Sequence, residues 1–185
     1  MSAIRIALTG TPASGKTSVA QKLSSSQTSD SVFSTIHTVR KLAQLHDCLG
    51  IYDEQDDAVE IDIGKLATKL LAKWAAAPTD NTIIDGHLAH HLPVDAIVIL
   101  RTNPDVLAVR LQQRGYPDEK IGQNVEWEML AGVWAEITEN GVPILELDTT
   151  VADSTQVAKA IEAWIMNGLQ PAMPANRIDW LANDL

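Results

Sequence analysis

Short apolar runs alternate along the chain with segments whose apolar residues recur at helical spacing. The apolar runs cover residues 4–8, 32–36, 82–85, 95–100 and 143–148, and each is typical of a buried strand. The helical patterns cover residues 15–23, 39–45, 63–76, 103–113, 121–140 and 154–166. Strands that alternate with helices predict an α/β fold of three layers, in which helices cover both faces of a five-stranded parallel sheet.

Three segments break this alternation. Residues 24–30 are polar and predict a surface loop, and residues 46–62 are acidic, lack periodicity and predict a solvated loop. The proline-containing tail begins at residue 168, and its residues 179–181 are expected to dock on the body. No repeat or composition shift marks a domain boundary, so residues 1–185 are predicted to form a single domain.

The first apolar run leads into a glycine-rich loop. Residues 10–17 read GTPASGKT and fit G-x-x-x-x-G-K-[ST], the pattern of a phosphate-binding loop. Its two glycines permit backbone angles at which successive N–H groups face a phosphate, and the next helix directs its positive end toward the same anion. Lys16 is expected to reach the β- and γ-phosphates of ATP, and the Thr17 hydroxyl to bind Mg²⁺. The alternative is a glycine-rich turn with an incidental lysine. The candidate nucleotide-binding residues here are Gly10, Ala13, Ser14, Gly15, Lys16, Thr17 and Ser18.

The third apolar run ends in a carboxylate, Asp85, which is followed by Gly86 and His87. Ligands bind at the carboxyl ends of strands in open α/β sheets, and in phosphate-loop enzymes an acidic residue there holds Mg²⁺. Asp85 is therefore a candidate magnesium ligand, and its alternative role is to cap the next turn. Among His87, His90 and His91, we expect His87 to face substrate. A zinc site is not predicted, because no cysteine or carboxylate completes a recognisable ligand spacing with these histidines.

Positive side chains gather between residues 101 and 120 of an otherwise acidic chain. Arg110 and Arg114 are four residues apart and share one face of a predicted helix, and Arg101 and Lys120 flank them. Arginine forks suit phosphate oxygens, so this group is predicted to neutralise the charge of transferring phosphates. The alternative is a set of surface ion pairs with the many carboxylates of the chain.

Composition narrows the function classes. The 185 residues include 45% apolar ones and carry a formal net charge of −10, which argues against broad nucleic-acid or membrane binding. The single cysteine, Cys48, precludes an intrachain disulfide and is compatible with a reducing compartment. No apolar run approaches the length of a membrane span, and a strand pattern already begins at residue 4. We therefore expect neither a membrane span nor a signal peptide, and a cytoplasmic location.

Three segments resemble a known family: LTGTPASGKT at residues 8–17, IIDGH at 83–87 and VILRTNPDVLAVRLQQRGYPDEKIGQNVEWE at 98–128. The last contains R-L-x-x-R-G-Y and K-x-x-x-N-V-x-x-E, and over most of its length the chain resembles the atypical adenylate kinases of archaea and eukaryotes. These are also described as ribosome-biogenesis factors related to the coilin-interacting nuclear ATPase. The resemblance implies a phosphate-loop fold of the nucleoside monophosphate kinase type with strand order 2-3-1-4-5. It also implies a monophosphate-binding segment at about 34–60 and a short lid at about 113–123.

The resemblance implies roles for residues of the nucleotide site. The loop residues Ala13, Gly15, Lys16, Thr17 and Ser18 would hold the phosphates of ATP, with Mg²⁺ as the cofactor. Arg110 would lie against adenine, and Arg114 of the lid would reach the phosphates. Asp85 and His87 match the Asp-x-His motif of the family, which supports magnesium binding and catalysis. Ala13 stands where many relatives have glycine and is expected to adopt a negative φ.

The second substrate implied by the resemblance is a nucleoside monophosphate, AMP first of all. It would lie across the crevice near Arg40, Asp62 and His87. Gln44 stands where relatives usually carry Arg or Lys, so Arg40 or Lys41 is expected to hold the AMP phosphate instead. Because the family also hydrolyses ATP and binds a small-subunit ribosomal protein, a basic protein of that kind is an expected partner.

Two other functions stay open at this point. In the first, the protein is mainly an ATPase switch that remodels a ribosomal protein or a pre-rRNA particle, and transfer to AMP is a side activity. In the second, it is a small-metabolite kinase of the shikimate or gluconate type, which the Arg-Gly-Tyr sequence at residues 114–116 disfavours.

Overall fold

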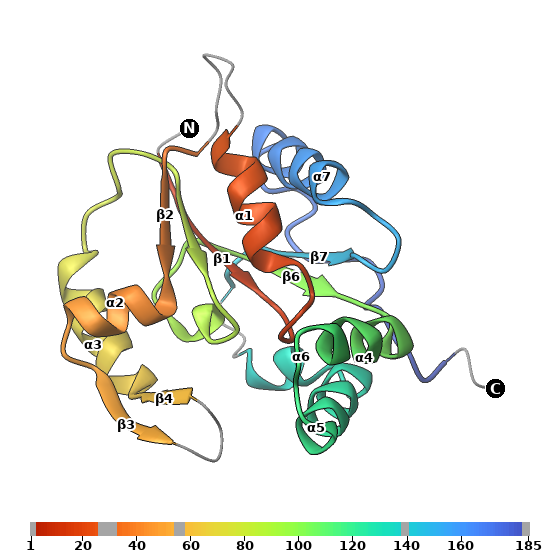
Figure 1. Cartoon of the computed structure of the whole chain (residues 1–185). Coiled ribbons are helices and arrows are strands. Elements are labelled where there is room, and N and C mark those ends of the chain that lie inside the picture. The colour runs from red at the N-terminus through yellow and green to blue at the C-terminus, as the bar shows by residue number, and fades with distance from the viewer. Residues whose placement is uncertain (1–2, 26–32, 54–57, 138–140, 183–185) are drawn as a thin grey trace.

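A computed structural model describes residues 3–25, 33–53, 58–137 and 141–182 of the chain. Five strands form one parallel sheet in the order β2-β5-β1-β6-β7 (Figure 1). They are β1 (Arg5–Thr9), β2 (Thr35–Thr38), β5 (Thr82–Asp85), β6 (Ala96–Arg101) and β7 (Ile144–Asp148). In this register Leu8 of β1 lies opposite both Asp85 of β5 and Val98 of β6. The predicted parallel sheet of an α/β fold is confirmed.

The predicted strand order 2-3-1-4-5 is corrected to 2-5-1-6-7. The reason is a second, two-stranded sheet, which sequence patterning did not reveal. Its antiparallel strands β3 (Leu49–Asp53) and β4 (Ala58–Ile61) lie between β2 and β5 in the chain, within the segment predicted as a solvated loop. A register shift between Leu49 and Tyr52 interrupts the two-residue alternation, and the apolar side chains of β3 are exposed. Residues 54–57 of the predicted loop lie outside the described residues.

Helices cover both faces of the large sheet. They are α1 (Lys16–Ser25), α2 (Val39–Leu45), α3 (Ile63–Lys73), the 3₁₀ helix η1 (Ala89–His91), α4 (Pro104–Gln113), α5 (Asp118–Met129), α6 (Gly132–Glu136) and α7 (Ser154–Met166). Figure 1 shows α1 and α7 side by side over one face, and residues of α2, α3 and α6 share a core with the other face. Within the described ranges, no helix is both long and apolar enough to cross a bilayer.

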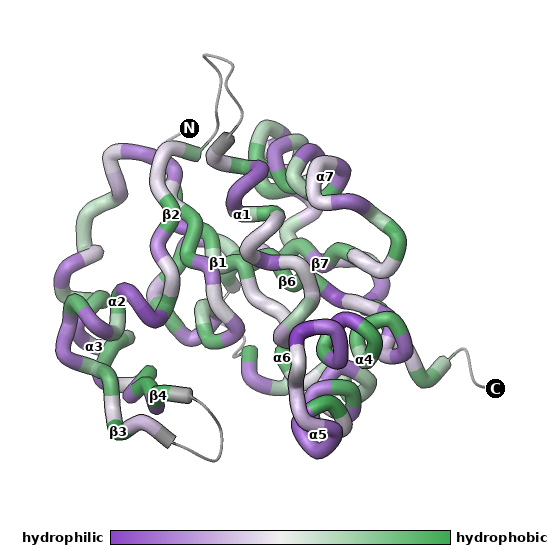
Figure 2. The backbone as a smooth tube through the Cα atoms, viewed as in Figure 1, coloured by the Kyte–Doolittle hydropathy of each residue, from purple (hydrophilic) through white to green (hydrophobic). Residues whose placement is uncertain are grey.

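Successive residues of the central strands face opposite layers. Ile6 and Leu8 of β1 belong to the core shared with α1 and α7, whereas Ala7 belongs to the core shared with α2, α3 and α6. In β6, Val98 and its neighbours divide between the two cores in the same way. Figure 2 shows the contrast between such apolar stretches and the hydrophilic outer turn of α5. Burial on both faces produces continuous apolar runs, which is why patterning located these strands.

The helix predicted over residues 121–140 is in fact two helices, α5 and α6. Ala131 lies between them with a left-handed φ of 51°. A Cβ on Gly132 would lie 2.1 Å from Cε2 of Trp127, so the chain can pack against the indole only with glycine there. The predicted end at 138–140 lies outside the described residues. This turn brings α6 back toward η1, which matters for the histidines of that helix.

Candidate active site

The loop between β1 and α1 has the backbone that phosphate binding requires. Gly10 and Gly15 have φ angles of 137° and 94°, which L side chains rarely adopt. A Cβ on Gly10 would also lie 2.3 Å from the carbonyl oxygen of Leu100 on β6. The motif glycines are therefore explained by conformation at both positions, and at Gly10 by a close backbone approach as well.

Two further loop residues bear on ligand binding. Ala13 has a φ of 68°, so the expectation of a negative φ there is wrong, and this left-handed conformation costs an alanine about 1 kcal/mol. The carbonyl of Ser14 accepts a hydrogen bond of 3.0 Å from the Thr149 hydroxyl, which ties the loop to the end of β7. The Ser14 Oγ is buried and has no hydrogen-bond partner among the described residues. A strained loop with an unpaired hydroxyl fits a bound phosphate, whose oxygens would accept from that group.

Lys16 folds back over the loop. Its Nζ donates to the carbonyl oxygens of Gly10 at 2.8 Å and Thr11 at 2.9 Å. Burial lowers the pKa of the Lys16 ammonium to about 8, and the nearby Asp85 carboxylate opposes this shift. The side chain is therefore a cation at neutral pH, held over the concave side of the loop by weak neutral acceptors that a phosphate would replace.

Thr17 and Asp85 meet at the carboxyl ends of β1 and β5. The Thr17 hydroxyl donates to Asp85 Oδ2 at 2.9 Å, and Asp85 is buried. A hydroxyl and a carboxylate are oxygen ligands of the kind that Mg²⁺ accepts. The donor set therefore fits the predicted magnesium role, which stays a prediction.

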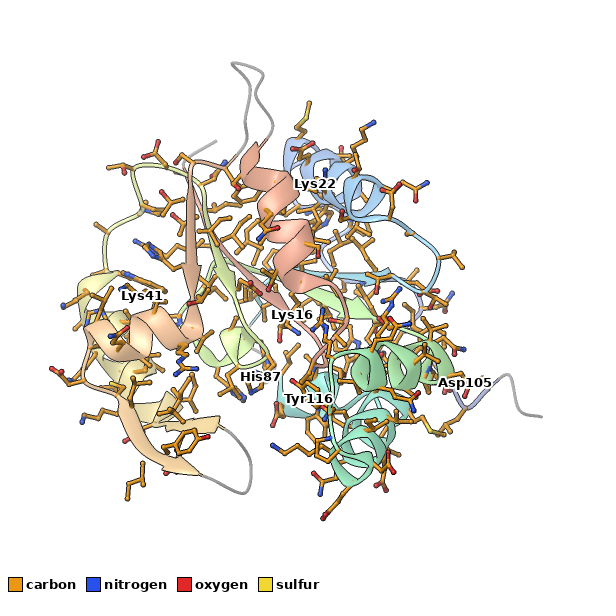
Figure 3. All side chains as sticks on the ribbon, viewed as in Figure 1. Lys16, Lys22, Lys41, His87, Asp105 and Tyr116 are labelled. Carbon is orange, nitrogen blue, oxygen red and sulfur yellow. The ribbon has the colours of Figure 1, made fainter. Side chains whose placement is uncertain are left out.

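Among the described residues, a larger and a smaller cavity border the loop. The larger, of about 580 Å³, is lined by the loop itself, by His87 and by the segment joining α4 to α5. The smaller, of about 280 Å³, lies on the other side of the loop and is lined by residues of α1, α4 and α7. Arg114 lines both. Figure 3 shows Lys16, His87 and Tyr116 gathered at the carboxyl ends of the central strands.

The smaller cavity contains the predicted adenine contact, Arg110. Its Nη2 donates to the carbonyl oxygen of Thr149 at 2.8 Å, so the guanidinium is fixed beside the cavity. The same cavity is also lined by Thr149, Ser154 and Val157, which sequence patterns did not identify as site residues. The available signal was positional, because residues 149–154 follow the carboxyl end of β7, the edge of the sheet at which ligands bind.

His87 lines the larger cavity, as expected of a residue that faces substrate. Burial lowers the pKa of His87, and the charge of Lys16 lowers it further, so the imidazole is neutral at pH 7. The backbone carbonyl of His87 accepts a 3.0 Å hydrogen bond from the Thr9 hydroxyl on β1. The ring is thus anchored through its backbone, and as a neutral group it can donate or accept a hydrogen bond without adding charge.

The predicted monophosphate contacts stand apart from these two cavities. Arg40 and Lys41 are exposed on α2, and Lys41 lies well away from Lys16 in Figure 3. Asp62 is also exposed, and its Oδ1 caps α3 by accepting from the backbone N–H of Lys65 at 2.9 Å. Neither cavity is lined by any of these three residues. Their substrate roles remain predictions, whereas the capping role of Asp62 is seen directly.

Arg101 does not join the phosphate-facing group. It is 1% exposed and forms a buried ion-pair network, with Nε donating to Glu128 Oε1 at 2.6 Å and Nη1 donating to Glu146 Oε1 at 2.8 Å. Glu128 Oε2 accepts from the Thr11 hydroxyl of the phosphate loop at 2.5 Å, and Glu128 Oε1 accepts from the Trp180 indole N–H at 3.1 Å. For Arg101 the ion-pair alternative is therefore correct, although the pairs are buried, and the tail docks as predicted.

Comparisons with known proteins agree with this geometry. A family model described as an AAA domain matches residues 6–131. A protein of Archaeoglobus fulgidus named "putative adenylate kinase" is 37% identical over 180 residues, which cover 96% of this chain and 92% of that protein. A protein of the same name from Natronomonas pharaonis is 35% identical over 172 residues, covering 92% and 95% respectively.

Solved structures share the fold at much lower identity. Deoxyadenosine kinase from M. mycoides with bound dATP has a TM-score of 0.51 at 16% identity and covers 88% of this chain and 99% of its own. Thymidylate kinase from Candida albicans has a TM-score of 0.53 at 14% identity and covers 91% and 93%. The phosphate loop, the parallel sheet and the archaeal relatives lead to one conclusion. This chain belongs to the P-loop kinase family of those archaeal proteins.

Proposed function

We propose that the protein is a nucleoside monophosphate kinase that transfers the γ-phosphoryl group of ATP to AMP and produces two ADP. The observation that carries the proposal is the position of Arg114, which lines both cavities where they border the phosphate loop. A donor nucleotide in the smaller cavity and an acceptor in the larger one would meet beside Lys16 and Arg114. The names of the archaeal relatives support AMP as the acceptor.

The chemistry asked of the chain is positioning and charge neutralisation, without a covalent enzyme intermediate. The loop amides and Lys16 would hold the β- and γ-phosphates, and Arg114 would stabilise charge on the group in transfer. Thr17 and Asp85 would hold Mg²⁺, which when bound neutralises charge on the phosphate oxygens. His87, neutral and at the wall of the larger cavity, would orient the acceptor phosphate by a hydrogen bond.

The proposed reaction is tested by following ADP with Mg·ATP and each of AMP, GMP, CMP and UMP, or with no acceptor. We expect ADP formation to depend on AMP, with two ADP produced for each AMP consumed. Hydrolysis that ignores AMP and rises with a basic small-subunit ribosomal protein would instead support the ATPase switch. Phosphorylation of shikimate or gluconate in place of AMP would support a small-metabolite kinase.

Arg114 is expected to act on the rate more than on ATP binding. We expect Arg114→Ala to lower kcat about 10²–10³-fold, because an arginine facing the transferring group stabilises charge that develops in the transition state. The Kd for an ATP analogue should rise much less, since the loop and Lys16 remain. Gln113→Ala, an exposed neighbour outside both cavities, is the matched control. A larger effect on Kd than on kcat would contradict the proposed role.

A further inference from the structure

Three side chains form a cluster between η1 and α6, and the proposed kinase reaction does not use them. They are His90 and His91 of η1 and Glu136 at the end of α6. His90 Nε2 lies 3.0 Å from Glu136 Oε2, and His91 Nε2 lies 3.3 Å from the same oxygen. One ligand atom from each residue lies within 4.8 Å of the other two. Sequence spacing gave no hint of the group, because Glu136 joins it only through the turn at Ala131.

The hydrogen bonds around His90 define which of its ring nitrogens is free. The Thr9 hydroxyl donates its one proton to the carbonyl of His87 at 3.0 Å, so its oxygen accepts from His90 Nδ1–H at 2.9 Å. The tautomer that keeps both bonds leaves a lone pair on Nε2, directed at a carboxylate oxygen 3.0 Å away. A cation held between Nε2 and Oε2 would satisfy both atoms.

The spacing and surroundings suit a tetrahedral metal ion. Metal bonds of 2.0–2.1 Å at tetrahedral angles separate neighbouring ligand atoms by about 3.3 Å, close to the two distances observed. The His90 side chain is 1% exposed, and its Nδ1 is oriented by a hydroxyl, the kind of second contact that metal-binding histidines make. The side chains of His91 and Glu136 are 29% and 36% exposed, so an ion could enter. Glu136 also lines the larger cavity, from which water could fill a fourth position.

We propose that His90, His91 and Glu136 bind a divalent transition metal of the zinc class, separate from the magnesium expected at Thr17 and Asp85. Zn²⁺ accepts both imidazole and carboxylate ligands, whereas Mg²⁺ disfavours the nitrogen ligands that two imidazoles would supply. With three protein ligands and a fourth position open to the cavity, the ion is exchangeable. The site ties η1 to α6, and bound metal therefore stabilises the fold.

The test is calorimetric titration of Zn²⁺ into the full chain, stripped with chelator and kept in millimolar Mg²⁺ so that the oxygen site is not competing. We expect one equivalent to bind, and each of His91→Ala and Glu136→Gln to weaken binding about tenfold or more. Both positions are partly exposed, so these variants should fold, which circular dichroism checks. Co²⁺ should give the visible absorption of a four-coordinate ion in the wild type and lose it in both variants.

His46→Ala is the matched control, because it removes an imidazole outside the cluster, at a residue whose backbone carbonyl accepts from the Cys48 thiol. We expect this variant to bind as the wild type does and to show the same rise in melting temperature with Zn²⁺. Binding that is lost in His46→Ala but kept in the other two variants would overturn the assignment. So would a wild type that binds no Zn²⁺ at micromolar concentrations, which would mean that His90 adopts the tautomer with its proton on Nε2.

Discussion

Replacing Lys16 with alanine is expected to lower the rate of phosphoryl transfer about 10³-fold or more. The ammonium donates to two neutral loop carbonyls, at 2.8 and 2.9 Å, and a phosphate can take the place of these acceptors. Its pKa of about 8 leaves it charged at neutral pH, and a bound triphosphate would raise that pKa again. Because Lys16 would neutralise charge on the β- and γ-phosphates, its removal is expected to act on the transition state.

The control is Lys22→Ala on the same helix. Lys22 is exposed near the far end of α1 in Figure 3, so its variant removes the same charge and stem without touching the loop. We expect AMP-dependent ADP formation to fall only in Lys16→Ala, with both variants folded by circular dichroism. Near-normal turnover in Lys16→Ala would refute the assignment of the loop to catalysis.

Sequence patterns predicted correctly those elements whose conformation is determined by residues close to them in the chain. The bounds of α2 and α7 match the sequence prediction, because each helix begins at its own side-chain cap, Thr38 and Asp153. Asn103 likewise caps α4, and Gly115 ends it with a left-handed φ of 77°. The phosphate loop belongs to the same class, since its glycines and lysine act within one turn of chain.

The features that sequence patterns did not predict depend on contacts between residues that are far apart in the chain. The break between α5 and α6 arises where Trp127 packs on Gly132, and an amphipathic stripe gives no sign of it. Ala13 takes a left-handed φ in a loop that is tied, at the Ser14 carbonyl, to Thr149, which is 135 residues beyond Ser14. The cluster of His90, His91 and Glu136 exists only because that helix break turns the chain back. In each case the sequence supplied the residue types, and tertiary packing decided their role.

Arg101→Ala is expected to lower the free energy of unfolding by about 3–5 kcal/mol, the second large effect. Arg101 is the shared partner of two carboxylates that are 2% and 1% exposed, and its Nη2 also donates to the Glu128 carbonyl at 2.8 Å. Without it, Glu128 and Glu146 are left as buried charges that lack a cation, and this desolvation cost is what makes breaking such a pair expensive. Urea unfolding measures the change.

The network also connects two parts of the molecule, because Glu128, near the C-terminal end of α5, accepts a hydrogen bond from Thr11 of the phosphate loop. Arg177→Ala is the control. The Cζ of this exposed arginine lies 4.0 Å from the ring centroid of Trp134, and its loss should lower the free energy of unfolding by about 0.5–1 kcal/mol. We expect Glu128→Gln added to Arg101→Ala to restore part of the lost stability, since one of the unpaired charges is then removed. An Arg101→Ala variant no less stable than Arg177→Ala would mean that water reaches the carboxylates of Glu128 and Glu146. It would also mean that packing alone holds the C-terminal end of α5.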